Sequence, residues 1–235
     1  MKIQDSVALV TGANRGLGLA FTRALLAGGA RKVYAAARDP RSVTLPGVEA
    51  IALDVTNAEQ IAAAARACAD VTLLINNAGV ARNSSLLAAN GVAAVRTELE
   101  TNFFGPLATT RAFAPILRAN GGGAIVNVLS VLAWINVPMV GTYCTTKSAA
   151  WSLTNGLRHE LRGQRTQVVA LHVGLMDTDM AAGMEGPKSA PADVVRQVLA
   201  ALEQGKDEVL ADELSRQVKG GLSAEPGSYI PELAG

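Results

Sequence analysis

Short apolar runs alternate with longer helical segments along the whole chain, and this alternation most constrains the fold. The runs expected as strands are Val7–Val10, Lys32–Ala36, Val48–Leu53, Val71–Ile75, Ala124–Val128, Gln167–His172 and Glu208–Leu210. Helices are expected near Leu17–Ala27, Ala58–Ala69, Val92–Ala119, Thr142–Arg162 and Ala192–Gln204. Continuous apolarity is typical of strands that are covered on both faces. The order strand–helix–strand therefore predicts an α/β fold, a doubly wound, seven-stranded parallel sheet flanked by helices on both faces.

One domain is predicted over residues 1–235. Hydrophobic residues make up 49% of the chain and charged residues 17%, which is a globular composition and excludes wholesale disorder. No low-complexity linker divides the chain, and no internal repeat is evident. Residues 178–189 are rich in Gly, Met and Ala without a sustained period, so we expect a mobile loop beside the functional site.

Charge and hydropathy exclude several classes of protein. The net charge is +1 and no long Lys/Arg run occurs, which argues against a nucleic-acid surface. No apolar stretch reaches about 18 residues, and the first apolar run is too short for a signal peptide. Cys68 and Cys144 have no metal-ligand spacing, so no metal site is expected and reduced thiols are favoured over a disulfide. We therefore expect a cytoplasmic protein without a membrane segment.

The first predicted strand runs into a glycine-rich turn that opens a helix. Gly12, Gly16 and Gly18 follow the spacing G-x-x-x-G-x-G. Glycine permits the tight turn and lets a pyrophosphate approach the backbone, while the helix N-terminus offers free N–H groups. A plain strand-to-helix turn is the alternative, but the position after the first strand favours dinucleotide binding. The residues predicted to bind are Gly12, Asn14, Arg15, Gly16, Leu17 and Gly18.

A tyrosine and a lysine four residues apart, Tyr143 and Lys147, lie on one face of a predicted helix. A phenol titrates near ~10 in water, and a nearby ammonium is expected to lower that pKa. Tyr143 is therefore a candidate proton donor or acceptor for alcohol or carbonyl chemistry. Ser130, thirteen residues upstream, lies just beyond a strand end, where its hydroxyl can donate to a carbonyl oxygen.

Together these segments resemble the short-chain dehydrogenase/reductase family, with its Rossmann-type fold, over essentially the whole chain. The motifs that carry the resemblance are Thr11-Gly-Ala-Asn-Arg-Gly-Leu-Gly18, Asn76-Asn-Ala-Gly79, Asn102, Ser130 and Tyr143-x-x-x-Lys147. The resemblance implies that Asn102, Ser130, Tyr143 and Lys147 are catalytic, with Asn102 anchoring a water in a proton relay. It further implies that Asn77, Ala78 and Gly79 pack along the cofactor, although Asn77 is as well suited to bonding the local backbone. Tyr143 and Lys147 would also contact the cofactor, Lys147 at the nicotinamide ribose.

Cofactor preference is set, in relatives, by the end of the second strand and by the glycine turn. NAD-preferring relatives usually carry an acidic residue where this chain has Ala37, followed by Arg38. A guanidinium pairs well with a 2′-phosphate, and Arg15 could complete the clamp. Asp39 could instead neutralise Arg38 or cap the next segment. We therefore expect NADP(H) to be preferred over NAD(H).

Three further positions are assigned by the same resemblance. Asp54 is expected to contact the adenine amine, with capping of the next helix as its alternative. After the sixth strand, relatives show Pro-Gly-x-x-x-Thr. Gly174 and Thr178 match this motif, while Val173 replaces the proline and restores a backbone N–H. Thr178 is expected to bond the nicotinamide carboxamide.

Apolar side chains between and after the catalytic motifs suggest a hydrophobic substrate pocket, for which core packing or a subunit interface is the alternative. The candidates are Trp134, Val137, Met139, Met176 and Met180, with residues 178–189 as the substrate loop. The substrate would be a small hydrophobic carbonyl or alcohol, since methionines adapt to varied shapes.

The sequence thus predicts an NADPH-dependent oxidoreductase that reduces a ketone or aldehyde. A non-catalytic NADP(H)-binding sensor or scaffold is the alternative. By resemblance, a homodimer or homotetramer is expected. His172, which ends a predicted strand, is expected to be packed or hydrogen-bonded rather than catalytic.

Overall fold

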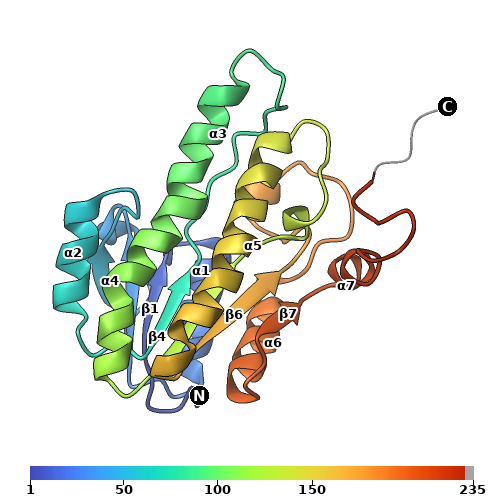
Figure 1. The fold of residues 1–235 in the computed structure, drawn as a ribbon. Helices are drawn as coiled ribbons and strands as arrows, with labels where there is room; N and C mark the ends of the chain where they lie inside the picture. The colour runs from blue at the N-terminus through green and yellow to red at the C-terminus, as the bar shows by residue number, and fades with distance from the viewer. Residues whose placement is uncertain (231–235) are drawn as a thin grey trace.

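The computed structural model describes residues 1–230 and shows seven parallel strands in one sheet (Figure 1). Their spatial order is β3-β2-β1-β4-β5-β6-β7, so the chain starts in the middle of the sheet and changes direction between β1 and β4. The strands are β1 (Val7–Thr11), β2 (Lys32–Ala37), β3 (Glu49–Ala52), β4 (Leu73–Asn76), β5 (Gly123–Val128), β6 (Thr166–His172) and β7 (Glu208–Leu210). All seven predicted strands are confirmed, with ends that differ by at most two residues. The last residues of the predicted domain, 231–235, lie outside the described residues.

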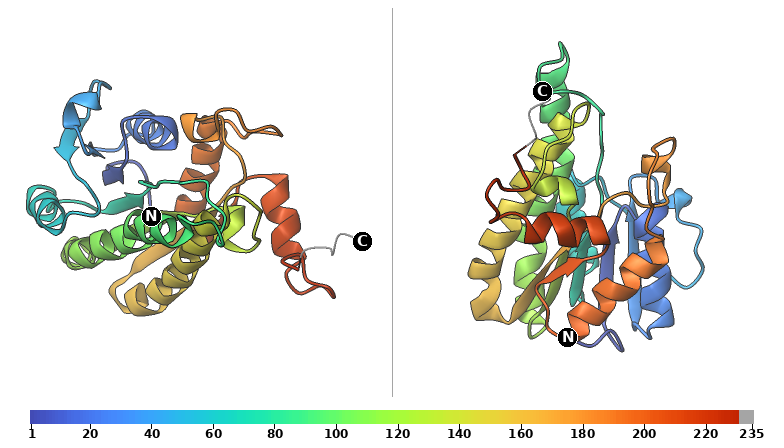
Figure 2. Two further views of the ribbon diagram at one scale, coloured as in Figure 1. Left: turned by 90° about the horizontal axis from the view of Figure 1, so that it is seen from above. Right: turned by 90° about the vertical axis from the view of Figure 1, so that its right-hand side faces the viewer.

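Helices cover both faces of the sheet (Figure 2). The α-helices are α1 (Gly16–Ala27), α2 (Ala58–Ala67), α3 (Gly91–Leu99), α4 (Gly105–Ala119), α5 (Gly141–Leu161), α6 (Pro191–Glu203) and α7 (Glu213–Gly220). Short 3-10 turns are η1 (Pro40–Ser42), η3 (Val131–Ala133), η4 (Arg162–Gln164) and η5 (Asp179–Ala181), while η2 (Glu100–Phe104) is a π-helical turn. The predicted doubly wound α/β architecture is confirmed.

The core divides into two layers because neighbouring residues of each strand point to opposite faces. In β1, Ala8 and Val10 pack with α1 and α6, whereas Val7 and Leu9 pack with α2, α4 and α5. All five residues of β1 are buried. This two-sided burial explains why β1 is apolar along its length, whereas the edge strand β3 is mostly exposed.

Two helical predictions need correction. The segment predicted as one helix over Val92–Ala119 is three elements, α3, η2 and α4, because a π-helical turn interrupts it. The helix α7 was not predicted, because it has only eight residues and a strongly polar sequence. Its start is marked by the N-cap Asp212, whose carboxylate accepts from the Ser215 N–H.

The structure also describes the two cysteines and the lengths of the helices. Cys68 and Cys144 are free thiols and both are buried. Within residues 1–230 no helix combines the length and the apolarity needed to cross a membrane.

Candidate active site

The glycine turn connects β1 to α1 and is shaped for close approach of the backbone. Gly12 and Gly16 have φ values of +65° and +53°, which residues with a side chain rarely adopt. A Cβ on Gly18 would lie 2.1 Å from the carbonyl oxygen of Gly12, so only glycine fits where α1 packs on the turn. At the α1 N-terminus, Arg15 makes no side-chain capping bond and the first turn contains no acidic residue. The free N–H groups and the Arg15 guanidinium therefore suit an anion such as a pyrophosphate.

Asn77 holds the glycine turn against the end of β4. Its side-chain amide donates to the carbonyl oxygens of Thr11 at 2.9 Å and Gly12 at 3.2 Å. The backbone N–H groups of Asn77 and Ala78 donate to the Thr11 hydroxyl, each at 3.0 Å. The structure therefore gives Asn77 the backbone-bonding role that sequence left open, and its contact with a cofactor stays a prediction.

At the end of β2, Arg38 is exposed and Asp39 turns away from it. The Asp39 carboxylate caps η1 by accepting from the Arg41 backbone N–H at 3.0 Å. The same carboxylate also pairs with the Arg41 guanidinium. Of the two alternatives for Asp39, capping is the one observed. Arg15, in the glycine turn, forms an exposed ion pair with Asp179 at 2.8 Å.

Asp54 follows β3 and stabilises a local turn. Its carboxylate accepts from the backbone N–H of Thr56 at 2.9 Å and from the Thr56 hydroxyl at 2.8 Å. The cap of α2 is Asn57, which accepts from the Gln60 N–H. The alternative that Asp54 caps this helix is therefore wrong.

Lys147 projects from α5 toward the carboxyl end of β5. Its ammonium donates to the carbonyl oxygen of Val128 at 2.8 Å and lies 5.4 Å from the centroid of the Tyr143 ring. The two side chains thus share one face of α5, as their spacing predicts. Burial lowers the pKa of Lys147 to about 8, so the group carries its charge at pH 7.

Tyr143 differs electrostatically from the sequence prediction. Burial raises the pKa of the Tyr143 phenol above its ordinary value, and the acidic groups of Cys144 and Glu98 act in the same direction. The predicted lowering of this pKa by Lys147 is wrong for this structure, because desolvation of the phenolate outweighs the ammonium. The phenol is therefore held in its protonated form.

Ser130 lies between β5 and η3, at the carboxyl edge of the sheet. Its hydroxyl accepts from the Leu132 N–H at 3.1 Å and donates to the Val173 carbonyl at 3.3 Å. The turn η3 packs against α5, which brings the Ser130 segment to the helix that carries Tyr143. His172 is buried beneath it, with Nδ1 3.0 Å from the Ser130 carbonyl oxygen, and burial lowers its pKa to about 3. The imidazole is therefore neutral and packed, as predicted.

Asn102 lies in the π-helical turn η2, and its side chain is almost fully buried. Its amide oxygen accepts from the Val80 N–H, and its amide nitrogen donates to the Val80 carbonyl, each at 2.9 Å. The same nitrogen donates to the Thr146 hydroxyl at 3.0 Å. A Cβ on Gly79 would lie 3.3 Å from the Asn102 amide oxygen and 4.0 Å from the Lys147 nitrogen. These groups therefore gather at one point, and the water-anchoring role of Asn102 stays a prediction.

The segment after β6 lies over the glycine turn. The Gly174 N–H donates to the Asp212 carboxylate at 2.5 Å, a partner that sequence reasoning missed. A Cβ on Gly16 would lie 3.4 Å from the Thr178 methyl group, so Thr178 is beside the expected pyrophosphate position. Two backbone bonds close the base of the 178–189 loop: the Asp177 N–H donates to the Ser189 carbonyl at 3.0 Å, and the Ser189 N–H donates to the Leu175 carbonyl at 2.9 Å.

The predicted pocket residues separate into two groups. Trp134 is buried, stacks on His172 with ring centroids 3.8 Å apart and packs with Trp151, which favours the core alternative for this residue. Met176 is half-buried and packs against the core on the side of α1 and α6, so the core alternative is favoured for it as well. Val137, Met139 and Met180 are exposed by 41%, 70% and 47%. They leave an apolar rim on the loops that flank the site.

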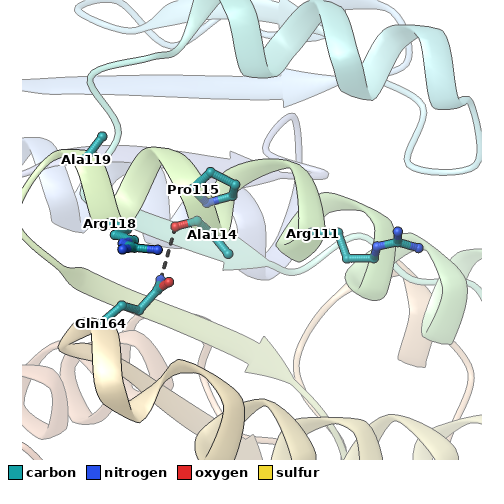
Figure 3. A pocket seen from close by; sticks show the side chains of 6 residues that line it. All are labelled: Arg111, Ala114, Pro115, Arg118, Ala119 and Gln164. Atoms are coloured by element: carbon teal, nitrogen blue, oxygen red, sulfur yellow. Dashed lines mark hydrogen bonds between the residues drawn. The ribbon is translucent and has the colours of Figure 1, made fainter.

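An open pocket of about 550 Å³ lies elsewhere, on the outer side of α4 (Figure 3). It is lined by Arg111, Ala114, Pro115, Arg118, Ala119 and Gln164. Ala119 ends α4 shortly before β5 begins, and Gln164 lies two residues before the start of β6, so the pocket is near the amino ends of these strands. It therefore contains none of the predicted catalytic residues.

Comparison with known proteins identifies the family. The family model of the short chain dehydrogenases matches residues 6–188. The chain belongs to the short-chain dehydrogenase family. The galactitol 2-dehydrogenase (L-tagatose-forming) of Cereibacter sphaeroides is 37% identical to this short-chain dehydrogenase over 190 residues, which cover 76% of this chain and 74% of the relative.

Solved structures share the fold of this short-chain dehydrogenase. A short-chain dehydrogenase from Burkholderia cenocepacia J2315 in complex with NADP has a TM-score of 0.92, 44% identity and 96% coverage of both chains. A family member from Burkholderia phymatum in complex with NAD has a TM-score of 0.84 and 24% identity, over 100% of this chain and 99% of that one. The fold thus occurs with both nicotinamide cofactors among these structures.

Proposed function

We propose that this short-chain dehydrogenase is an NADPH-dependent oxidoreductase that reduces a ketone or aldehyde and, in reverse, oxidises a secondary alcohol. The observation that carries this proposal is the convergence of Tyr143, the buried ammonium of Lys147 and the amide of Asn102 beside Gly79. Ser130 joins them from a turn that packs on the same helix. All four groups lie at the carboxyl edge of the sheet, where ligands bind in open α/β folds.

The residues present fit a dinucleotide. The glycine turn leaves room for a pyrophosphate, and the α1 N-terminus supplies uncapped N–H groups without a competing carboxylate in its first turn. Arg15, which pairs with Asp179, and Arg38 both have exposed side chains, and the family resemblance implies that both lie near the adenosine ribose. Two guanidinium groups favour a 2′-phosphate, which supports NADP(H) over NAD(H). The identity of 44% with a relative solved in complex with NADP supports the same preference.

The side chains divide the chemistry among them. The bound nicotinamide would supply or accept the hydride. Ser130 would donate a hydrogen bond to the substrate oxygen and polarise the carbonyl, while Tyr143 would transfer a proton to that oxygen as negative charge develops. The high pKa of Tyr143 keeps its proton available for donation. Lys147, held by the Val128 carbonyl, would stabilise the phenolate that remains after transfer.

The substrate we propose is a small hydrophobic carbonyl compound or alcohol. Val137, Met139 and Met180 offer apolar, exposed side chains on the loops around the site, and the 178–189 loop would close over the substrate. The relative named galactitol 2-dehydrogenase supports alcohol–carbonyl interconversion as the reaction class. We further propose a cytoplasmic homodimer or homotetramer, on the family resemblance alone.

Replacing Tyr143 with Phe tests the proposal. Since general acid catalysis contributes about 10²- to 10⁴-fold, the Tyr143→Phe variant should lose activity by a factor in this range with a panel of ketones. NADPH binding, measured by fluorescence titration, should persist. Tyr229→Phe, an exposed tyrosine, is the matched control and should keep full activity. Ordinary turnover by Tyr143→Phe would exclude Tyr143 as the acid, and tight NADPH binding without turnover by the unaltered protein would favour a sensor.

A further inference from the structure

Glu98 is a fully buried carboxyl group on α3 to which the mechanism above assigns no role. Its exposed fraction is 0%. One carboxylate oxygen accepts from the Arg82 backbone N–H at 2.5 Å, and the other has no hydrogen-bond partner among residues 1–230. Burying a half-satisfied carboxylate is costly, and glutamate is seldom fully buried unless paired. Such a cost points to a role other than packing.

The partner of Glu98 belongs to a strap, residues 80–84, that continues from Gly79. Asn102 bonds both the N–H and the carbonyl of Val80, and Glu98 bonds the N–H of Arg82. At the far end of the strap, the Ser84 carbonyl accepts from the backbone N–H and the hydroxyl of Thr142, at 3.2 and 3.1 Å. The strap is thus fixed to the α3–η2 segment by two side chains and to α5 by a third. It connects Gly79 to the helix turn that precedes Tyr143.

The strap also lies beside the catalytic helix. Helix α3, which carries Glu98, packs along α5, the helix that carries Tyr143 and Lys147. The hydrogen bonds of Glu98 and Thr142 therefore hold two points of one segment that links Gly79 to the start of α5.

We propose that Glu98 is a positioning residue for carbonyl reduction: its carboxyl group fixes the strap between Gly79 and the start of the helix that carries Tyr143. The proposal rests on the proposed role of Tyr143 as the proton donor. It extends that role by naming a residue that does not touch the substrate but holds the backbone that leads to the helix of the donor.

Glu98→Gln is the conservative variant, because glutamine keeps the shape and the acceptor for the Arg82 N–H. We expect its kcat and KM for the carbonyl substrate to stay close to those of the unaltered enzyme. Glu100→Gln is the matched control, since Glu100 lies two residues on and is exposed. A loss in Glu98→Gln as large as the loss in Glu98→Leu would overturn the role of this hydrogen bond.

Glu98→Leu tests the strap, because leucine removes the acceptor as well as the charge. Relative to Glu98→Gln, we expect a KM for the carbonyl substrate that is raised by about tenfold, as for loss of one hydrogen bond. A KM equal to that of Glu98→Gln would overturn the positioning role of the hydrogen bond.

Amide hydrogen exchange separates failure of this proposal from failure of the proposed function, because it needs no turnover. In Glu98→Leu the backbone amides of the strap should exchange faster than in Glu98→Gln, since the Arg82 N–H has lost its acceptor. Equal exchange in the two variants would overturn the proposal even if the enzyme is active. Faster exchange in Glu98→Leu would support it even if Tyr143→Phe were to retain turnover.

Discussion

Single residues in this site are tuned by opposing effects, and burial is the larger of them. Lys147 lies on the same face as Tyr143, yet burial and the acidic groups nearby set the pKa of the phenol above its ordinary value. The same burial lowers the pKa of Lys147 to about 8, which leaves the ammonium charged at pH 7. A protonated phenol beside a charged ammonium is the pairing needed to protonate a developing alkoxide.

Cofactor preference is the residue-scale prediction that follows from Arg38. Replacing Arg38 with Asp removes a cation and adds repulsion toward a 2′-phosphate. Because hydrogen bonds to charged groups contribute about 1.5–3 kcal/mol, the KM for NADPH should rise by about 10- to 100-fold, while the KM for NADH should change little. Steady-state kinetics with both cofactors measures this. Arg31→Asp, exposed at the opposite end of β2, controls for the change in net charge. Equal effects on NADPH and NADH would contradict the assignment.

Candidate catalytic residues could be predicted from sequence because their spacing fixes their neighbours, but their partners could not. The i, i+4 relation placed Tyr143 and Lys147 together without any tertiary information. Glu98, by contrast, bonds a backbone group 16 positions away, and only the folded chain brings Arg82 to it. The spacing of Glu98 could have indicated its burial, because Glu98 lies four residues from both the buried Ala94 and the buried Asn102, on the same face of the helical segment.

At the scale of elements, the glycine turn depends on close contact between α1 and the end of β1. Gly18 lies within α1, where alanine would ordinarily be favoured by about 1 kcal/mol. Its Cβ would nevertheless lie 2.1 Å from a backbone oxygen that cannot move aside cheaply. Packing therefore overrides helix propensity at this position.

At this scale we predict that replacing a glycine with alanine destabilises the protein at one position and stabilises it at another. Gly18→Ala should lower the free energy of unfolding by about 1–3 kcal/mol, the usual cost of overpacking, and should weaken NADPH binding. Gly156→Ala is the matched control within α5, because its Cβ would meet no atom within 4 Å. That variant should be more stable by about 0.5–1 kcal/mol. Urea denaturation measures both values, and a Gly18→Ala protein as stable as the parent would refute the packing argument.

Elements with a strong local signal were predicted, and those defined by tertiary contacts were not. Most strands are buried apolar runs, so their sequence alone reveals them; β3 at the sheet edge is the exception, with three exposed residues out of four. The interruption at η2 has no such signal, because Glu100–Phe104 continues a helical sequence and the altered turn is coupled to the bonds that Asn102 makes with Val80. Helix α7 depends on Asp212, which caps it and also binds the Gly174 N–H.

For the molecule as a whole, the site exists only when the sheet is assembled. Its parts follow β1, β2, β4, β5 and β6, and they meet at one edge because all seven strands are parallel. The cofactor site that we propose spans these strand ends, so a ligand bound there would contact segments from most of the chain. Binding should therefore stabilise the entire fold rather than one part of it.

Thermal unfolding tests this linkage. A ligand at 100 times its dissociation constant stabilises the native state by about 2.7 kcal/mol, and each kcal/mol shifts Tm by about 2–4 °C in a domain of this size. NADPH at that concentration should raise Tm by about 5–10 °C, and NADH at the same concentration should raise it less. Arg38→Asp should unfold at the same temperature as the parent without ligand, because Arg38 is exposed, but should lose most of the NADPH shift. Equal shifts from the two cofactors would contradict the preference for NADPH, and no shift from either would contradict nucleotide binding itself.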